Sequence, residues 1–134
     1  MKNQRHVARE SALQCLYLMD VCHLDVLSAC GTVYTDDLNS EIRTWCRHWV
    51  EGVAEHKNEI DALLKQQAEN WEMERMAAID RNILRLATFE ILYENQTPIP
   101  VILNEAIELA KTYSSQDSGK FVNGLLDKIK NKRQ

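Results

Sequence analysis

The chain is poor in the residues that interrupt helices. Its 134 residues include only four glycines and two prolines, and the two prolines, Pro98 and Pro100, stand almost side by side. Long tracts elsewhere carry apolar residues at helical spacing. The composition therefore predicts an all-α fold, and the length predicts a single domain over residues 1–134.

The chain also lacks a long apolar run. The longest runs, such as Ile91-Leu92-Tyr93, are bounded by charges and fall far short of the roughly 20 residues that a membrane span needs. The first six residues lead into an amphipathic segment and not into an apolar signal core. We therefore expect a cytoplasmic protein with no membrane contact.

Signals of catalysis are missing as well. The sequence has no Gly-rich phosphate loop, no internal repeat and no low-complexity tract. No carboxylate pair stands with a histidine or cysteine at a spacing that indicates a hydrolytic or transfer site. We predict no catalytic residue, no cofactor and no enzyme activity.

The four cysteines form no CxxC pair. With two nearby histidines they make six soft ligands on paper: Cys15, Cys22, His23, Cys30, Cys46 and His48. A zinc site is one interpretation of this set. Because Cys15 falls on the buried side of a predicted helix and the other cysteines are scattered, we instead predict reduced, buried or half-buried thiols and no metal site.

The net charge of −4 has the wrong sign for a protein that binds phosphates. The charge is unevenly distributed, however: residues 1–10 carry +2, residues 120–134 carry +4, and the middle of the chain carries −10. Two basic ends on an acidic body can bind an anion where they meet. The alternative, which composition alone favours, is that both ends are merely solvated.

The first predicted helix covers residues 4–21. Its core stripe consists of Ala8, Ala12, Cys15, Leu16 and Met19. A neighbouring stripe at i, i+4 spacing mixes cations with a phenol: His6, Arg9, Leu13 and Tyr17. Such a stripe suits a single-stranded nucleic acid, with cations on phosphates and an aromatic ring under a base. The alternative is that Tyr17 packs under a loop while the arginines pair with local acids.

The pattern dissolves over residues 22–35, which we predict to be a linker containing Gly31. Asp36 or Asp37 then offers an N-cap for a second helix, up to about residue 53. Trp45 and Trp49 follow one another by one turn on its apolar stripe and are predicted to lie in the core.

A third helix is predicted over about residues 55–69, and a fourth over about 74–94. The fourth is apolar on most sides, with a polar arc formed by Arg81, Arg85 and Thr88. A helix that is apolar all round must be surrounded by others, so we place it at the centre of the molecule.

Residues 97–129 predict two amphipathic helices joined by a polar turn. Thr97 is a candidate N-cap, and Pro98 and Pro100 suit a helix entrance. The two apolar stripes are Ile102, Ala106, Leu109 and Tyr113, then Val122, Leu125, Leu126 and Ile129. Phe121 falls off the second stripe.

Four separated segments resemble the NusB family of bacterial transcription antitermination factors. They are RESALQCLY at 9–17, DRNILRLATFEILY at 80–93, NEAIELAK at 104–111 and KFVNGLLDKI at 120–129. The resemblance implies a compact helical domain of about six or seven helices in two small bundles. It also implies a non-enzymatic factor that binds boxA-type single-stranded RNA together with the ribosomal protein NusE. The pair would join an antitermination complex on RNA polymerase during ribosomal RNA synthesis.

The resemblance further implies an RNA surface made by the first helix and the turn before the last one. The matching residues of this chain are Lys2, Arg5, Arg9, Tyr17, Asp117, Lys120 and Phe121. The cations would attract phosphates and the two rings would stack bases, whereas Asp117 would cap the last helix or accept hydrogen bonds from base amino groups. The NusE contact maps to Asp80 on the central helix.

Three alternatives stay open. His6 and Val7 stand where the family pattern has further arginines, so one alternative is a protein–protein adaptor of the same fold with little RNA affinity of its own. Another is a fragment of a ribosomal RNA cytosine methyltransferase, which would need a domain beyond Gln134. The third concerns assembly, because a homodimer could cover the basic stripe.

Overall fold

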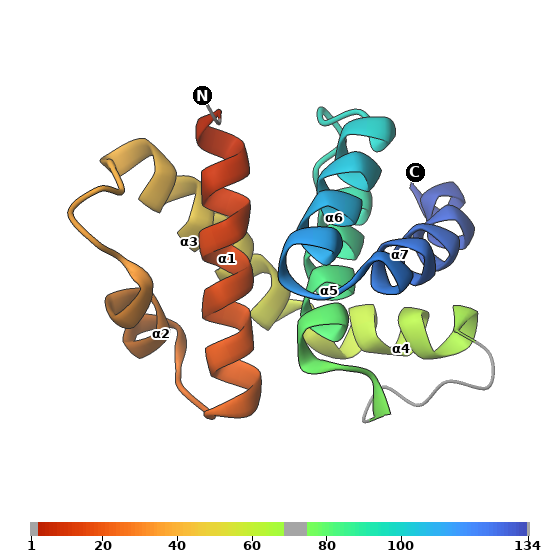
Figure 1. Cartoon of the computed structure of the whole chain (residues 1–134), viewed down its shortest axis with the longest axis horizontal. Helices are drawn as coiled ribbons and strands as arrows, with labels where there is room; N and C mark the ends of the chain where they lie inside the picture. Colours follow the sequence, from red (N-terminus) through yellow and green to blue (C-terminus); the bar gives the residue numbers. More distant parts are fainter. Residues whose placement is uncertain (1–2, 69–74, 134) are drawn as a thin grey trace.

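The computed structural model describes residues 3–68 and 75–133, and in them the chain is all-α. The helices are α1 (Gln4–Val21), α2 (Val26–Val33), α3 (Ser40–Glu55), α4 (Lys57–Gln67), α5 (Ala78–Tyr93), α6 (Ile99–Tyr113) and α7 (Gln116–Ile129), and a 3₁₀ turn at Lys130–Lys132 follows (Figure 1). These residues contain no strand, so the predicted fold class is confirmed. In the same ranges, no helix is both long enough and apolar enough to cross a membrane.

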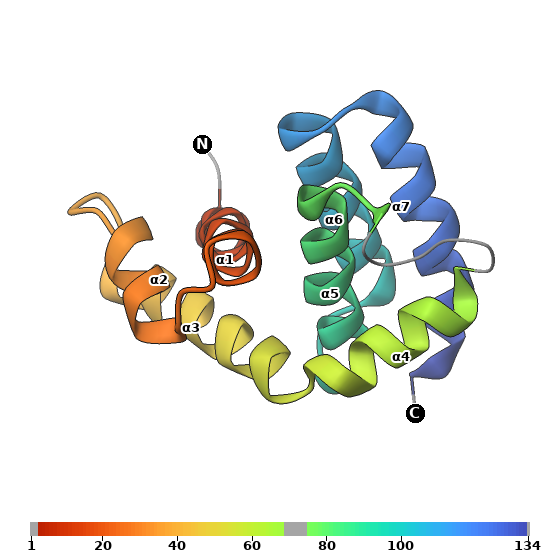
Figure 2. The same cartoon turned by 90° about the horizontal axis from the view of Figure 1, so that it is seen from below.

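The helices form two bundles that meet at α5. One bundle contains α1, α2 and α3, and the other contains α4 to α7 (Figures 1 and 2). α5 packs against α1 and α3 from the first bundle and against α4, α6 and α7 in its own. Residues 82–91 of α5 are all buried. The predicted central position of this helix is confirmed.

The prediction of a linker over residues 22–35 was wrong. This interval contains α2, whose first turn is capped by the Asp25 carboxylate, which accepts the backbone N–H of Ser28 at 2.8 Å. α2 buries Ala29 and Cys30 against the bundle. Two turns are too short to show a period in sequence, so tertiary packing and not propensity determines this helix.

Two predicted N-caps were also wrong. α3 begins after Asn39, whose side chain accepts the N–H of Ile42 at 2.9 Å, and not after Asp36 or Asp37. The N-cap of α6 is Pro98 and not Thr97, and no side chain caps that end.

The two arginines of the polar arc of α5 belong to an ion-pair network. Arg85 donates to the two carboxylate oxygens of Asp61 at 2.8 and 3.0 Å and to Asp20 at 3.1 Å, and Arg81 also pairs with Asp20. Burial opposes ionisation of Asp20, but hydrogen bonds from Arg81 and Asn82 outweigh it and hold the pKa of Asp20 below its ordinary value. The network joins the end of α1 and the helix α4 to α5.

The basic C-terminal end is anchored by Arg133. Its guanidinium donates to the backbone carbonyls of Glu90, Ile91, Glu94 and Thr97 at 2.7–3.2 Å. The last carbonyls of α5 have no partner within the helix, and a cation there also complements the helix dipole. Arg133 is therefore a structural cation and does not belong to a solvated tail.

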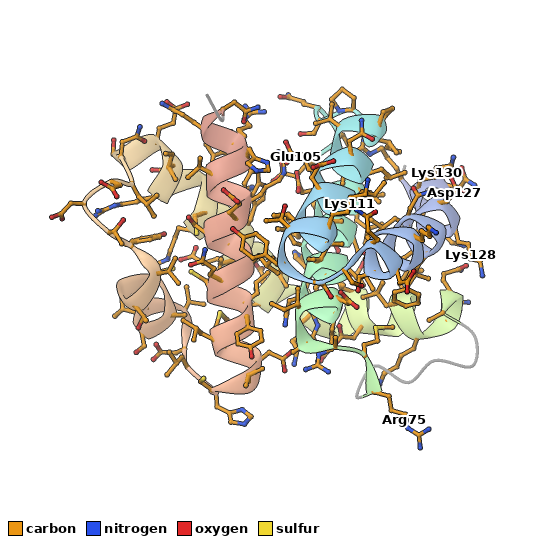
Figure 3. All side chains as sticks on the ribbon, in the orientation of Figure 1. Arg75, Glu105, Lys111, Asp127, Lys128 and Lys130 are labelled. Atoms are coloured by element: carbon orange, nitrogen blue, oxygen red, sulfur yellow. The ribbon has the colours of Figure 1, made fainter. Side chains whose placement is uncertain are left out.

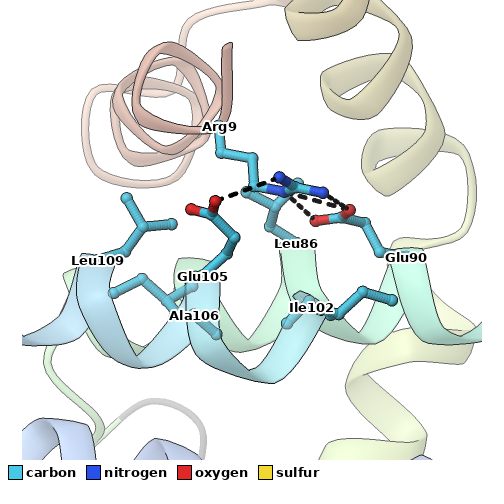
Figure 4. A pocket seen from close by; sticks show the side chains of 9 residues that line it. Arg9, Leu86, Glu90, Ile102, Glu105, Ala106 and Leu109 are labelled. Atoms are coloured by element: carbon cyan, nitrogen blue, oxygen red, sulfur yellow. Dashed lines mark hydrogen bonds and ion pairs between the residues drawn. The ribbon is translucent and has the colours of Figure 1, made fainter. Parts of the chain in front are cut away.

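A buried ion pair joins the two bundles. The Arg9 guanidinium of α1 donates to the Glu90 carboxylate of α5 at 2.6 and 3.0 Å, and both side chains are at most 3% exposed (Figure 4). Glu105 of α6 approaches Arg9 at 3.7 Å, and the Trp49 ring lies beneath the guanidinium carbon at 4.8 Å. Burial raises the pKa of Glu90, although Arg9 opposes that shift.

We predict that Arg9→Met lowers the free energy of unfolding by about 3–5 kcal/mol at pH 7, because Glu90 keeps a buried charge without a partner. In this variant burial and the nearby carboxylates of Glu94 and Glu105 all raise the pKa of Glu90, and no cation opposes them, so the folded state takes up a proton at a higher pH than the unfolded state does. The deficit should therefore shrink as the pH falls from about 7 to about 5. Urea denaturation at several pH values measures it.

The matched control is Arg47→Met, which breaks an exposed pair with Glu51 and should change stability far less. A double variant, Arg9→Met with Glu90→Leu, should recover most of the loss, because no buried charge remains. Equal losses for Arg9→Met and Arg47→Met would contradict the role assigned to the buried pair.

The Phe89 ring fills space that Gly52 leaves open where α3 meets α5. A Cβ at Gly52 would overlap the Phe89 ring, whereas a Cβ at Gly124 of α7 meets no heavy atom within 4 Å in the described part of the chain. Gly52→Ala should therefore destabilise the protein by about 1–3 kcal/mol through overpacking.

Gly124→Ala should instead stabilise by about 0.5–1 kcal/mol, because alanine is the better helix former. Thermal unfolding of the two variants provides the comparison. A stabilised Gly52→Ala variant would show that Phe89 can move aside at no cost.

Candidate functional site

The predicted mixed stripe of α1 faces the second bundle. His6 approaches Glu105 through Nδ1 at 2.6 Å, Arg9 is paired with Glu90, and Leu13 is fully buried. The arginine does pair with acids, but these acids lie on α5 and α6 and not nearby in sequence. Arg9 is thus not exposed to a phosphate, although the sequence placed it among the RNA contacts.

Arg5 lies outside the contact between α1 and the second bundle. It is exposed at the start of α1, and its guanidinium carbon lies 4.2 Å from the centre of the Trp45 ring. Trp45 is half-buried, whereas Trp49 is buried, and the two rings lie 5.3 Å apart. The core prediction therefore holds for Trp49, and Trp45 supports an exposed cation. Lys2, the other predicted cation of this end, lies outside the described residues.

Tyr17 lies in a groove of about 440 Å³ between the two bundles. We call it the Tyr17–Tyr113 groove; its walls include Leu13, Tyr17, Thr32, Val33, Ile79 and Tyr113. Tyr113, predicted to be in the buried stripe of α6, is 38% exposed here. Its hydroxyl donates to Glu10 at 2.8 Å, and burial together with that hydrogen bond raises its pKa to about 12. The Tyr113 phenol therefore stays protonated at neutral pH.

The turn before α7 is built by serines. The Ser115 hydroxyl accepts the N–H of Ser118 at 3.0 Å and caps α7, so Ser115 takes the capping role that was one of the two roles implied for Asp117. Asp117 and Lys120 are exposed in the first turns of α7. Phe121, which falls off the apolar stripe in sequence and was predicted to stack a base, is half-buried against the core.

Asp80 connects this turn to α5. Its carboxylate accepts the Ser118 hydroxyl at 3.0 Å, and the side chain is only 9% exposed, with its second oxygen buried and unpaired in the described residues. Asp80 was expected at a NusE contact. Its burial leaves it little surface for a direct one.

The sequence reasoning missed Lys111. This residue is exposed on α6, and a Cβ at Gly119 would lie 3.2 Å from its Cγ, so the Lys111 chain runs over the start of α7 (Figure 3). Lys128 and Lys130 lie instead on the side of α7 away from α1. The signal available in the sequence was Lys111 itself, the lysine that ends NEAIELAK, nine residues before Lys120.

Three thiols meet inside the first bundle. Cys15 Sγ lies 3.9 Å from Cys30 Sγ and 4.0 Å from Cys46 Sγ, so α1, α2 and α3 each contribute one. Cys22 is exposed, and all four cysteines are free. Within residues 3–68 and 75–133, no group of three or more His, Cys, Asp or Glu side chains is arranged to hold a metal ion.

The geometry thus brings Tyr17 and the start of α7 to one region and leaves Arg5 about 18 Å away along α1, twelve residues at 1.5 Å each.

Comparison with known proteins identifies the family to which this fold belongs. The chain is 46% identical to a transcription antitermination protein NusB from Lysinibacillus sphaericus (strain C3-41), over 94% of this chain and 96% of the relative. It is 45% identical to the protein of that name from Geobacillus kaustophilus (strain HTA426), over 95% of each.

Solved structures agree. T. maritima NusB matches with a TM-score of 0.92 at 34% identity, over 99% of this chain and 94% of that one. A chain from a structure of the antitermination factors NusB and NusE in complex with dsRNA matches with a TM-score of 0.89 at 25% identity, over 98% of this chain and 99% of that one. The model of the NusB family matches residues 6–131, and the chain belongs to the NusB family.

Proposed function

We propose that this protein is an RNA-binding transcription antitermination factor that binds boxA-type single-stranded RNA together with the ribosomal protein NusE. The observation that carries the proposal is the likeness, over nearly the whole of both chains, to a chain from a complex of NusB, NusE and dsRNA. A factor of this family is not an enzyme. It acts in the cytoplasm as one domain over residues 1–134, on RNA polymerase during ribosomal RNA synthesis.

The proposed RNA surface runs from the start of α1 to the start of α7. Arg5, Lys111 and Lys120 are exposed, and no ion pair among the described residues holds any of them. Unpaired cations attract phosphates without regard to sequence. Lys2, three residues before Arg5 in the sequence, is a further cation of the proposed surface.

Aromatic and acidic residues complete the surface. Tyr17 stacks a base, and Phe121, which is half-buried, offers the outer part of its ring. Asp117 lies in the first turn of α7, where a carboxylate favours the helix and remains able to accept a hydrogen bond from a base amino group.

Two residues of the expected site act indirectly in this proposal. Arg9 fixes α1 against α5 through Glu90 and so positions Arg5 and Tyr17. Asp80 holds Ser118 and thereby the start of α7, so it shapes the turn of the proposed RNA surface, and its own buried side chain is assigned no direct NusE contact.

An adaptor with little RNA affinity of its own is the second candidate. Two specific observations favour it: Arg9 is paired in the interior, and the Arg133 guanidinium donates to backbone carbonyls. Few cations are then left for phosphates. A homodimer that covers Arg5 would act in the same direction.

Fluorescence anisotropy of a labelled boxA-type RNA, with and without NusE and across a salt series, tests the proposal. Arg5→Ala and Lys120→Ala should each weaken binding. Each should also reduce the slope of log affinity against log salt by about 0.7–1, the contribution of one phosphate contact.

Lys65→Ala is the control, because Lys65 is exposed on α4, which contributes nothing to the proposed surface. Unchanged RNA affinity in the double variant Arg5→Ala with Lys120→Ala, with NusE association intact, would favour the adaptor.

A further inference from the structure

The Tyr17–Tyr113 groove is a sizeable hollow that is largely apolar and has two aromatic rings in its lining. Its volume of about 440 Å³ falls in the range of small-ligand sites, about 300–1,000 Å³. None of the described residues that line it is charged. The groove therefore suits a neutral, flat, aromatic group better than a phosphate or a metal ion.

The two tyrosines are prepared differently. Tyr113 is held by its hydrogen bond to Glu10, so its ring is a fixed wall. The Tyr17 hydroxyl has no hydrogen-bond partner within the residues that the structure describes, and it remains able to donate to or accept from a ligand. The groove therefore has a fixed wall at Tyr113 and a hydroxyl at Tyr17 that is available to a ligand.

Polar groups stand at the rim of the groove. Gln14, Thr32 and Thr35 line it beside the apolar residues. The Gln14 amide and the Thr35 hydroxyl can each donate and accept, as the polar edge of a nucleobase requires, whereas the Thr32 hydroxyl donates to the Ser28 carbonyl at 2.9 Å and is left to accept. Gln14 and Thr35 are exposed and lie outside the core, and Gln14 also hydrogen-bonds the Tyr113 hydroxyl.

The groove also adjoins the proposed RNA surface. Ile79 of its wall precedes Asp80, which holds Ser118 at the start of α7, and Tyr113 is the last residue of α6 before the same turn. Lys111, one half-turn earlier on α6, lies over the start of α7. A chain whose phosphates follow these cations would pass the mouth of the groove.

We propose that the Tyr17–Tyr113 groove receives one unstacked nucleobase of the bound RNA and so gives the protein selectivity at one RNA position. This inference rests on the proposed function and adds to it a base site with a new wall, Tyr113, and a polar rim. The base lies against the tyrosine rings, and Gln14, Thr32 and Thr35 bind its edge.

The test is an abasic scan of the boxA-type RNA in the presence of NusE, in which each base in turn is removed and the affinity is measured. For the unaltered protein, one abasic position should weaken binding by about tenfold, the loss expected for one stacked base. For Tyr113→Ala, the same abasic change should weaken binding no more than about twofold, because the base has already lost its wall.

Tyr93→Ala is the matched control. Tyr93 is 39% exposed and its hydroxyl donates to Glu59 at 2.6 Å, as that of Tyr113 does to Glu10, but Tyr93 lies at the end of α5 away from the groove. For Tyr93→Ala, each abasic position should weaken RNA binding by the same factor as for the unaltered protein. A groove-filling variant at the exposed rim, Thr35→Trp, should reproduce the flattened scan without removing any wall, and circular dichroism and NusE binding report whether each variant folds.

An identical abasic scan for the unaltered protein, Tyr113→Ala and Thr35→Trp, with RNA bound by all three, would overturn the base site and leave the proposed function standing. Absence of RNA binding by the unaltered protein, with and without NusE, would overturn both.

Discussion

The rest of the structure depends on the ion pair between Arg9 and Glu90. Two charges buried to this degree are costly to desolvate, and they are tolerated only where the hydrogen bonds between them are well formed. That requirement allows one register of α1 against α5, since a shift by one residue would turn Arg9 away from Glu90. The register in turn directs Arg5 to solvent and Tyr17 to the groove. A residue that reads as a phosphate ligand is therefore the one that positions the remaining surface.

Sequence periodicity predicted the parts of the fold that are long and regular. The bounds of α1, the burial of α5 and the inward face of α7 follow from apolar spacing over three or more turns. The helix α2 was not predicted from the sequence, because its eight residues, which include Gly31, are too few to show a helical period. The N-caps of α3 and α6 were predicted wrongly because several consecutive residues could cap each helix. Only the packing of the first buried side chains decides among them.

The sequence identified residue types that suit an RNA site more accurately than it predicted the burial and the partners of those residues. A helical wheel places Arg9 beside Tyr17, but it contains no information about a carboxylate 81 positions later in the chain. The same holds for Arg133, which binds carbonyls that its own segment does not contain. Tyr113 shows the opposite error, because its spacing indicates burial whereas its position at the end of α6 leaves it partly exposed. Long-range partners, and not local pattern, separate structural cations from available ones.

This separation bears on how an acidic protein binds RNA. Four of the sixteen basic residues hold helices together: Arg9, Arg81 and Arg85 through ion pairs, and Arg133 through backbone carbonyls. The cations left for phosphates on the proposed surface are few, so electrostatic attraction alone supplies limited affinity and a shallow salt dependence. Affinity must then come from contacts that salt does not screen, namely base stacking on aromatic rings and surface shared with a partner protein. Under the proposed function, joint binding with NusE and base stacking on tyrosine are two consequences of one cause. The guanidinium groups that could have bound RNA hold the helices together.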